Sequence, residues 1–89
     1  MDIEVKKPTR EELEALGVFD WGIWESPVTT FPWEYGSVEV CYFLEGKVVI
    51  ETSDGKSVEV GKGDLVRFPK GLKCTWKVLE PVKKHYNFE

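Results

Sequence analysis

The feature that most limits the fold of this chain is its succession of short apolar runs, each ended by a turn rich in glycine or proline. From residue 38 onward these runs alternate with period two and are rich in β-branched and aromatic residues, as strands are. We expect strands at 38–44, 47–52, 57–60, 65–68, 73–79 and 82–88, with two more between residues 20 and 35. Short strands at such close spacing are typical of a β-sandwich or barrel. A chain of 89 residues closes one core, so residues 1–89 form a single domain.

The segments between these strands carry specific turn signals. Asp54-Gly55 is the strongest hairpin cue in the chain. We expect a second turn at Glu45-Gly46, and we expect Pro81 to separate the last two strands.

One short helix is expected ahead of the strands. Thr9 and Glu12 have the spacing of a capping box, in which the side chain of each residue accepts a hydrogen bond from the backbone N–H of the other. Leu13 and Leu16 supply a small apolar face, and Gly17 is a natural C-terminal stop. The pattern therefore predicts a helix over residues 10–16.

Two turn spacings resemble the signature motifs of the cupin family. Glu39 is followed by six residues and then Gly46, as is the metal-ligand Glu of the first cupin motif. The second motif runs Gly, five residues, Pro, one residue, Gly, two residues, His, and its matching positions here are Gly63, Pro69, Gly71 and Cys74. The resemblance covers residues 33–78 and implies an all-β, cupin-type jelly-roll barrel, here with one short N-terminal helix.

The metal-ligand positions of the family are mostly replaced. Trp33 and Tyr35 stand where the first motif has a His pair, and Cys74 stands where the second motif has its His. Of the four usual ligands only Glu39 remains, and aromatic rings do not hold a metal well. We therefore expect no cofactor and no metal site, with a divalent metal as the less favoured alternative.

A narrower resemblance is to small single-domain cupins named for ureidoglycine aminohydrolase. It lies in residues 38–46, in residues 68–76 and in the ending over residues 84–88. Two-domain enzymes of the wider group are manganese-dependent hydrolases, and their ligand set includes histidines that this chain lacks. Small members mostly have no assigned reaction, so the resemblance implies a fold and leaves the reaction open.

Glu39 and Cys74 are the candidate catalytic residues. Alternation places Glu39 on one strand face with Cys41 and Phe43, and a carboxylate inside a barrel is costly unless it is paired or hydrogen-bonded. It is either an acid/base or ligand-anchoring group, or a structural Glu bonded to a Tyr, Trp or Lys. Cys74 is either a reactive thiol, a ligand or a plain pocket or core residue.

Four further side chains are candidate ligand-binding residues: Trp33, Tyr35, Trp76 and Cys41. The rings either stack on a flat ligand or fill the space that the family's metal occupies, and Cys41 is also a natural core residue. We expect Glu39, Cys74 and the three aromatic residues to converge on one cavity. His85 has the opposite parity to Val82 and Tyr86, so we expect it on the outer or rim face and outside the chemistry.

Composition restricts the partners. A formal net charge of −4 argues against nucleic acid, whose binding depends on neutralising phosphates. No apolar run approaches the roughly 20 residues that span a bilayer, so we expect no membrane contact. The N-terminus shows no export signal, which favours a cytoplasmic location with Cys41 and Cys74 as free thiols. A homodimer formed through sheet edges is a further expectation.

Two functions stay open at this level. The first is a small-molecule-binding cupin with a pocket around Glu39, acting as a hydrolase or isomerase on a small polar metabolite or without catalysis. The second is a metal-free, non-catalytic cupin module that acts through its surface or as an oligomer.

Overall fold

The computed structural model describes residues 2–89. Its strands form one seven-stranded antiparallel sheet, with one short α-helix and one 3₁₀ turn before it. The elements are β1 (Glu4–Lys6), α1 (Arg10–Leu16), η1 (Val18–Asp20), β2 (Gly22–Ser26), β3 (Thr29–Glu34), β4 (Glu39–Thr52), β5 (Ser57–Gly61), β6 (Leu65–Phe68) and β7 (Lys73–Phe88). This is the predicted all-β class with one N-terminal helix.

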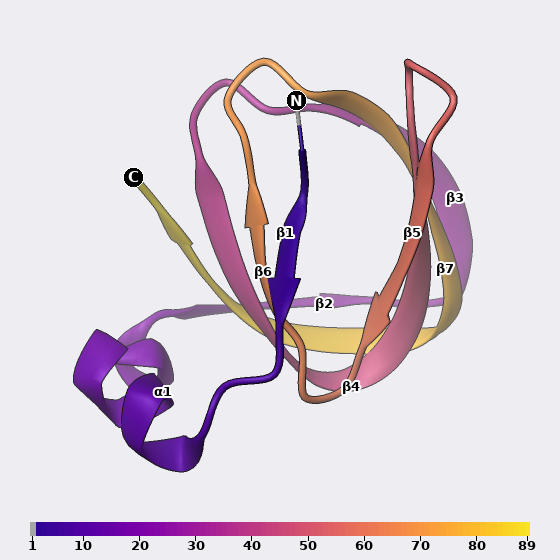
Figure 1. The fold of residues 1–89 in the computed structure, drawn as a ribbon. Helices are drawn as coiled ribbons and strands as arrows, with labels where there is room; N and C mark the ends of the chain where they lie inside the picture. Colours follow the sequence, from indigo (N-terminus) through magenta and orange to yellow (C-terminus); the bar gives the residue numbers. More distant parts are fainter. Residues whose placement is uncertain (1) are drawn as a thin grey trace.

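Two long strands, β4 and β7, organise the sheet. They pair from Glu39 opposite Phe88 to Thr52 opposite Cys74. Four shorter strands pair with one half of a long strand each, β6 and β5 with β4, and β2 and β3 with β7, whereas β1 pairs with β6. Because both long strands curve strongly, the sheet rolls round into a barrel (Figure 1).

The expected turn at Glu45-Gly46 and the expected break at Pro81 are corrected by the structure. Both segments lie inside continuous strands, where the pairing of β4 with β7 shifts its register. Gly46 has a φ of 98°, and a Cβ on it would lie 2.4 Å from the carbonyl oxygen of Pro81. Such a bulge inserts residues that do not pair, so the missing N–H of Pro81 removes no ladder hydrogen bond.

The bulge also changes which residues of β4 face inward. Before it, Glu39, Cys41 and Phe43 are buried, as alternation predicts, whereas after it Val48 and Ile50 are buried. The inward parity thus changes from odd to even within one strand. The core that results consists of Tyr35, Cys41, Phe43, Val48, Ile50, Val60, Val66, Phe68, Leu72, Cys74, Trp76, Val78 and Val82.

The N-terminal segment is partly as expected. Thr9 and Glu12 form the predicted capping box, and Gly17 ends α1 in the left-handed conformation. Sequence analysis did not predict β1 or η1. Within residues 2–89, no helix is long and apolar enough to cross a membrane.

His85 lies on the outer face of β7, as its parity predicts, but it is buried there. This face lies opposite the core, and η1 covers it. Nδ1 lies 3.3 Å from the carbonyl oxygen of Trp21, and the ring meets Phe19 edge to face. The structure therefore gives His85 a packing role beneath the N-terminal segment.

Candidate functional site

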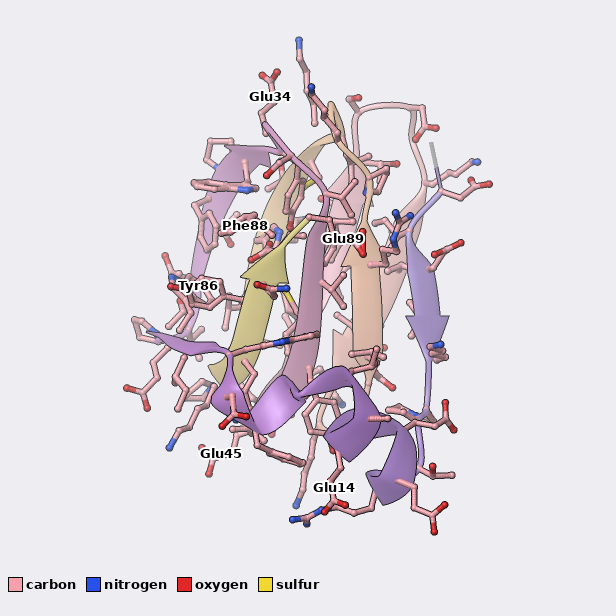
Figure 2. All side chains as sticks on the ribbon, turned by 90° about the vertical axis from the view of Figure 1, so that its left-hand side faces the viewer. Glu14, Glu34, Glu45, Tyr86, Phe88 and Glu89 are labelled. Atoms are coloured by element: carbon pink, nitrogen blue, oxygen red, sulfur yellow. The ribbon has the colours of Figure 1, made fainter. Side chains whose placement is uncertain are left out.

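An aromatic pocket of about 250 Å³ opens between β2, β3, β4 and β7. Its lining residues are Trp24, Phe31, Trp33, Tyr35, Glu39, Trp76, Lys84, Tyr86 and Phe88. Trp33 and Phe88 are about half exposed and so lie at the opening, whereas Tyr35 and Trp76 are buried. Figure 2 shows Tyr86 and Phe88 one after the other along the last residues of β7.

The aromatic walls are held by ring contacts and one buried hydrogen bond. Phe31 stacks on Trp76 at 5.9 Å between ring centroids, and Trp24 meets Trp76 edge to face at 5.8 Å. The Trp76 indole N–H donates to the Tyr35 hydroxyl at 3.2 Å. Burial, and then the nearby acidic group of Glu39, raises the pKa of Tyr35, so its hydroxyl keeps its proton at neutral pH.

The polar part of the pocket is a buried ion pair. Lys84 Nζ lies 3.4 Å from Glu39 Oε2, and both side chains are less than a tenth exposed. The same ammonium lies over the rings of Trp76 and Trp24, at 4.6 Å and 5.0 Å from their centroids. Lys84 therefore meets both conditions under which a protein tolerates a buried charge, a counter-charge and favourable π faces.

Cys41 lies beneath this pair and does not line the pocket. Lys84 Nζ donates to Cys41 Sγ at 3.1 Å. Burial raises the pKa of the Cys41 thiol to about 12, although the ammonium of Lys84 opposes the shift. The thiol is therefore protonated at neutral pH, and its place is behind the polar group.

Cys74 is also outside the pocket. It is 6 % exposed and borders a shallow surface depression near the β4–β5 hairpin, opposite Trp33 in the register of β3 and β7. Burial raises the pKa of its thiol, with an opposing contribution from Trp76. Of the residues expected to converge, the structure brings together Glu39, Trp33, Tyr35 and Trp76, and it places Cys74 elsewhere.

Sequence analysis missed five lining residues: Trp24, Phe31, Lys84, Tyr86 and Phe88. Lys84 is the most consequential, because it supplies the positive charge of the site. Its signal was present in the even parity of Val82 and Tyr86, which places residue 84 on the same inner face. A single Lys between apolar residues is more often solvated, so parity alone did not single it out.

The residues present do not fit the metal of the cupin family. The two aromatic residues in His places offer no nitrogen ligand, and the remaining Glu39 is already neutralised by the Lys84 ammonium. Among residues 2–89, no three side chains of His, Cys, Asp and Glu gather closely enough to hold a metal ion.

The rolled antiparallel sheet, with its pocket between β2, β3, β4 and β7, has the barrel architecture that cupin domains share with other small β-barrels. The profile of the EutQ-like cupin domain matches residues 13–86. The chain therefore belongs to the EutQ-like cupin family.

Known relatives agree with this placement. A DUF861 family protein from Thermotoga maritima has a crystal structure that matches with a TM-score of 0.98 and 56 % identity, over 99 % of this chain and all of that one. The Clostridium difficile EutQ structure matches with a TM-score of 0.69 and 27 % identity, over 97 % of this chain and 66 % of that one.

A curated relative is longer than this chain. The acetate kinase EutQ of Clostridioides difficile (strain 630) is 36 % identical over 70 residues, which are 79 % of this chain and 42 % of that protein. The chain thus spans less than half the length of the curated relative that it matches.

Proposed function

We propose that this domain binds a small molecule with a flat body and one polar end in the aromatic pocket. The observation that carries the proposal is the junction of aromatic walls with the buried Glu39–Lys84 pair in one opening of about 250 Å³. Ligand sites are typically apolar hollows with a few placed polar groups. The walls would stack on the flat body, and the ion pair would meet the polar end.

We extend this proposal to the chemistry of the pocket. Glu39 is the candidate acid/base group, because it is the carboxylate of the lining and faces the inside of the barrel. In the enzyme form of this proposal, Glu39 serves a hydrolase or isomerase that acts on a small polar metabolite. Cys74 is not part of this proposal, because it lies outside the pocket.

Tryptophan fluorescence tests the binding proposal directly. Three of the four tryptophans line the pocket and Trp21 does not, so a Trp21→Phe background restricts the emission to the site. Benzamide, benzoate and benzyl alcohol are suitable probes, since each has a flat ring and one polar end. At least one of them is expected to change the emission with saturation.

A matched pair of variants tests whether the probe binds in the aromatic pocket. Trp33→Ala removes a half-exposed wall and is expected to weaken binding by about threefold to tenfold, the usual worth of an aromatic contact. Phe19→Ala removes a similarly exposed ring outside the pocket and is expected to leave binding unchanged. If no probe changes the emission, the proposal fails and the surface-acting module becomes the better hypothesis.

A further inference from the structure

The pocket holds a nucleophile, the primary amine of Lys84, whose reactivity the proposed binding function does not use. Its side chain is 5 % exposed and lines the pocket together with Glu39 and Trp76. Lys84 is opposite Phe43 in the register of β4 and β7, and its side chain reaches along the inner face to Glu39 and Cys41. A lysine with its amine inside an enclosed apolar site is the usual arrangement for covalent chemistry with carbonyl compounds.

We propose that Lys84 forms a Schiff base with an aldehyde or ketone bound in the aromatic pocket. The inference rests on the proposed binding function and names the ligand class, a small carbonyl compound with a flat, mostly apolar body. The pocket volume and the aromatic walls limit the size and shape of the ligand's body, and Lys84 determines that its reactive group is a carbonyl.

Glu39 is placed to carry the proton that this reaction moves. The ammonium of Lys84 first gives a proton to the Glu39 carboxylate 3.4 Å away, which frees the nitrogen lone pair. The nitrogen then attacks the carbonyl carbon, the C–N bond forms, and one proton passes from that nitrogen to the carbonyl oxygen, which gives a carbinolamine. Glu39 returns its proton to the hydroxyl, which leaves as water when the C–O bond breaks, so a protonated imine and the Glu39 carboxylate remain. Ammonium plus carbonyl compound thus gives iminium plus water, with no further reactant.

The surroundings of the nitrogen suit the product as well as the resting state. The iminium carries the same single positive charge at the same atom. It would keep the Glu39 carboxylate and the two indole faces as stabilising partners. In the unreacted protein these lie at 3.4 Å, 4.6 Å and 5.0 Å from Nζ. The half-exposed Trp33 and Phe88 lie at the opening through which the water leaves.

Reductive trapping tests the inference. The full chain is treated with a limiting amount of benzaldehyde and sodium cyanoborohydride, which reduces an imine to a stable secondary amine. Intact mass measures the benzyl groups added, and peptide mass spectrometry locates them. Lys84 is expected to be modified first, at least about tenfold faster than the exposed lysines.

Two variants and one control keep the test free of folding effects. Lys84→Met leaves Glu39 buried without a counter-charge, so the double variant Glu39→Gln with Lys84→Met is made as well and both are checked for folding. Both are expected to lose the fast labelling. Lys83→Met removes the neighbouring amine, which lies outside the pocket, and is expected to label like the wild type.

The outcomes separate the two proposals. Fast labelling of Lys84 that the double variant lacks supports the Schiff base. Saturable binding of benzyl alcohol together with labelling confined to exposed lysines overturns the Schiff base and leaves the binding function standing. Absence of both pocket binding by any probe and labelling of Lys84 overturns both.

Discussion

Lys84 and Glu39 form a buried ion pair, and Glu39 stands where the first cupin motif has a metal ligand. Either a metal ion or a cationic side chain must neutralise the inward-facing carboxylate, because an isolated buried charge is costly. Here an ammonium 3.4 Å away does so. Removing either partner alone would leave the other as an uncompensated buried charge, at a cost of about 3 to 5 kcal/mol.

Cys41, which lies beneath this pair, is expected to make the folded protein less stable at alkaline pH. Burial raises the pKa of its thiol from an ordinary 9.0 to about 12, so the folded protein holds this proton more tightly than the unfolded chain does. The resulting stability is complete below pH 9 and is lost as the pH rises toward 12. At about pH 10.5 the loss from this group is on the order of 2 kcal/mol.

The test is the change in melting temperature between about pH 8 and about pH 10.5. The wild type is expected to lose more than Cys41→Ala, since the variant lacks this thiol. Burial, and then Glu39, raise the pKa of Tyr35 in both proteins, and the variant lacks only the smaller contribution of Cys41 to that shift. Equal losses would show that the thiol does not titrate as its burial implies.

At the scale of the elements, the bulge in β4 decides how the long strands close. Gly46 has a φ of 98° and no room for a side chain, because a Cβ would lie 2.4 Å from the Pro81 carbonyl oxygen. Gly63 has a similar φ of 90° but nothing within 4 Å of its would-be Cβ. A side chain at either position would have to adopt an unfavourable positive φ, but only at Gly46 would it also collide with the backbone.

Alanine at these two positions separates the effects. Gly63→Ala is expected to cost about 1 to 2 kcal/mol, the strain of a left-handed alanine. Gly46→Ala adds a backbone clash and is expected to cost about 3 kcal/mol or more. Urea unfolding measures both free energies, and similar costs for the two variants would mean that the bulge yields to a methyl group.

The whole molecule builds its pocket from strands that are far apart in sequence. Residues from β2 and β3 meet Glu39 at the start of β4 and residues from both ends of β7, because both long strands curve and the sheet rolls (Figure 1). The path of paired strands ends at β1 and β2. Pairing of two copies at such an edge, the expected homodimer, stays a prediction.

At the scale of the whole domain, we also expect independence of transition metal. Trp33, Tyr35 and Cys74 replace the family's histidines, and Lys84 neutralises Glu39. A chelator is therefore expected to leave the melting temperature unchanged, and elemental analysis is expected to find far less than one equivalent of transition metal per chain. One equivalent of metal that disappears in Glu39→Ala would contradict this.

The sequence by itself determined what short-range patterns can encode. Alternation placed Glu39, Cys41 and Phe43 on one buried face, and the Thr9–Glu12 spacing gave the capped helix. The glycine and proline spacings indicated a cupin barrel. Each of these follows from the period of a strand or from the backbone freedom of a turn residue, which neighbouring residues fix.

Only the tertiary structure decided which groups meet. Whether Glu39 finds a cation depends on the register of β4 against β7 and on a side chain that lies 45 residues away. The same pairing made the expected turn at Gly46 a bulge, and the packing of η1 buried His85. Local periodicity sets the face on which a side chain lies. Contacts across the sheet depend on the register between strands that are far apart in sequence, and local residue patterns do not determine that register.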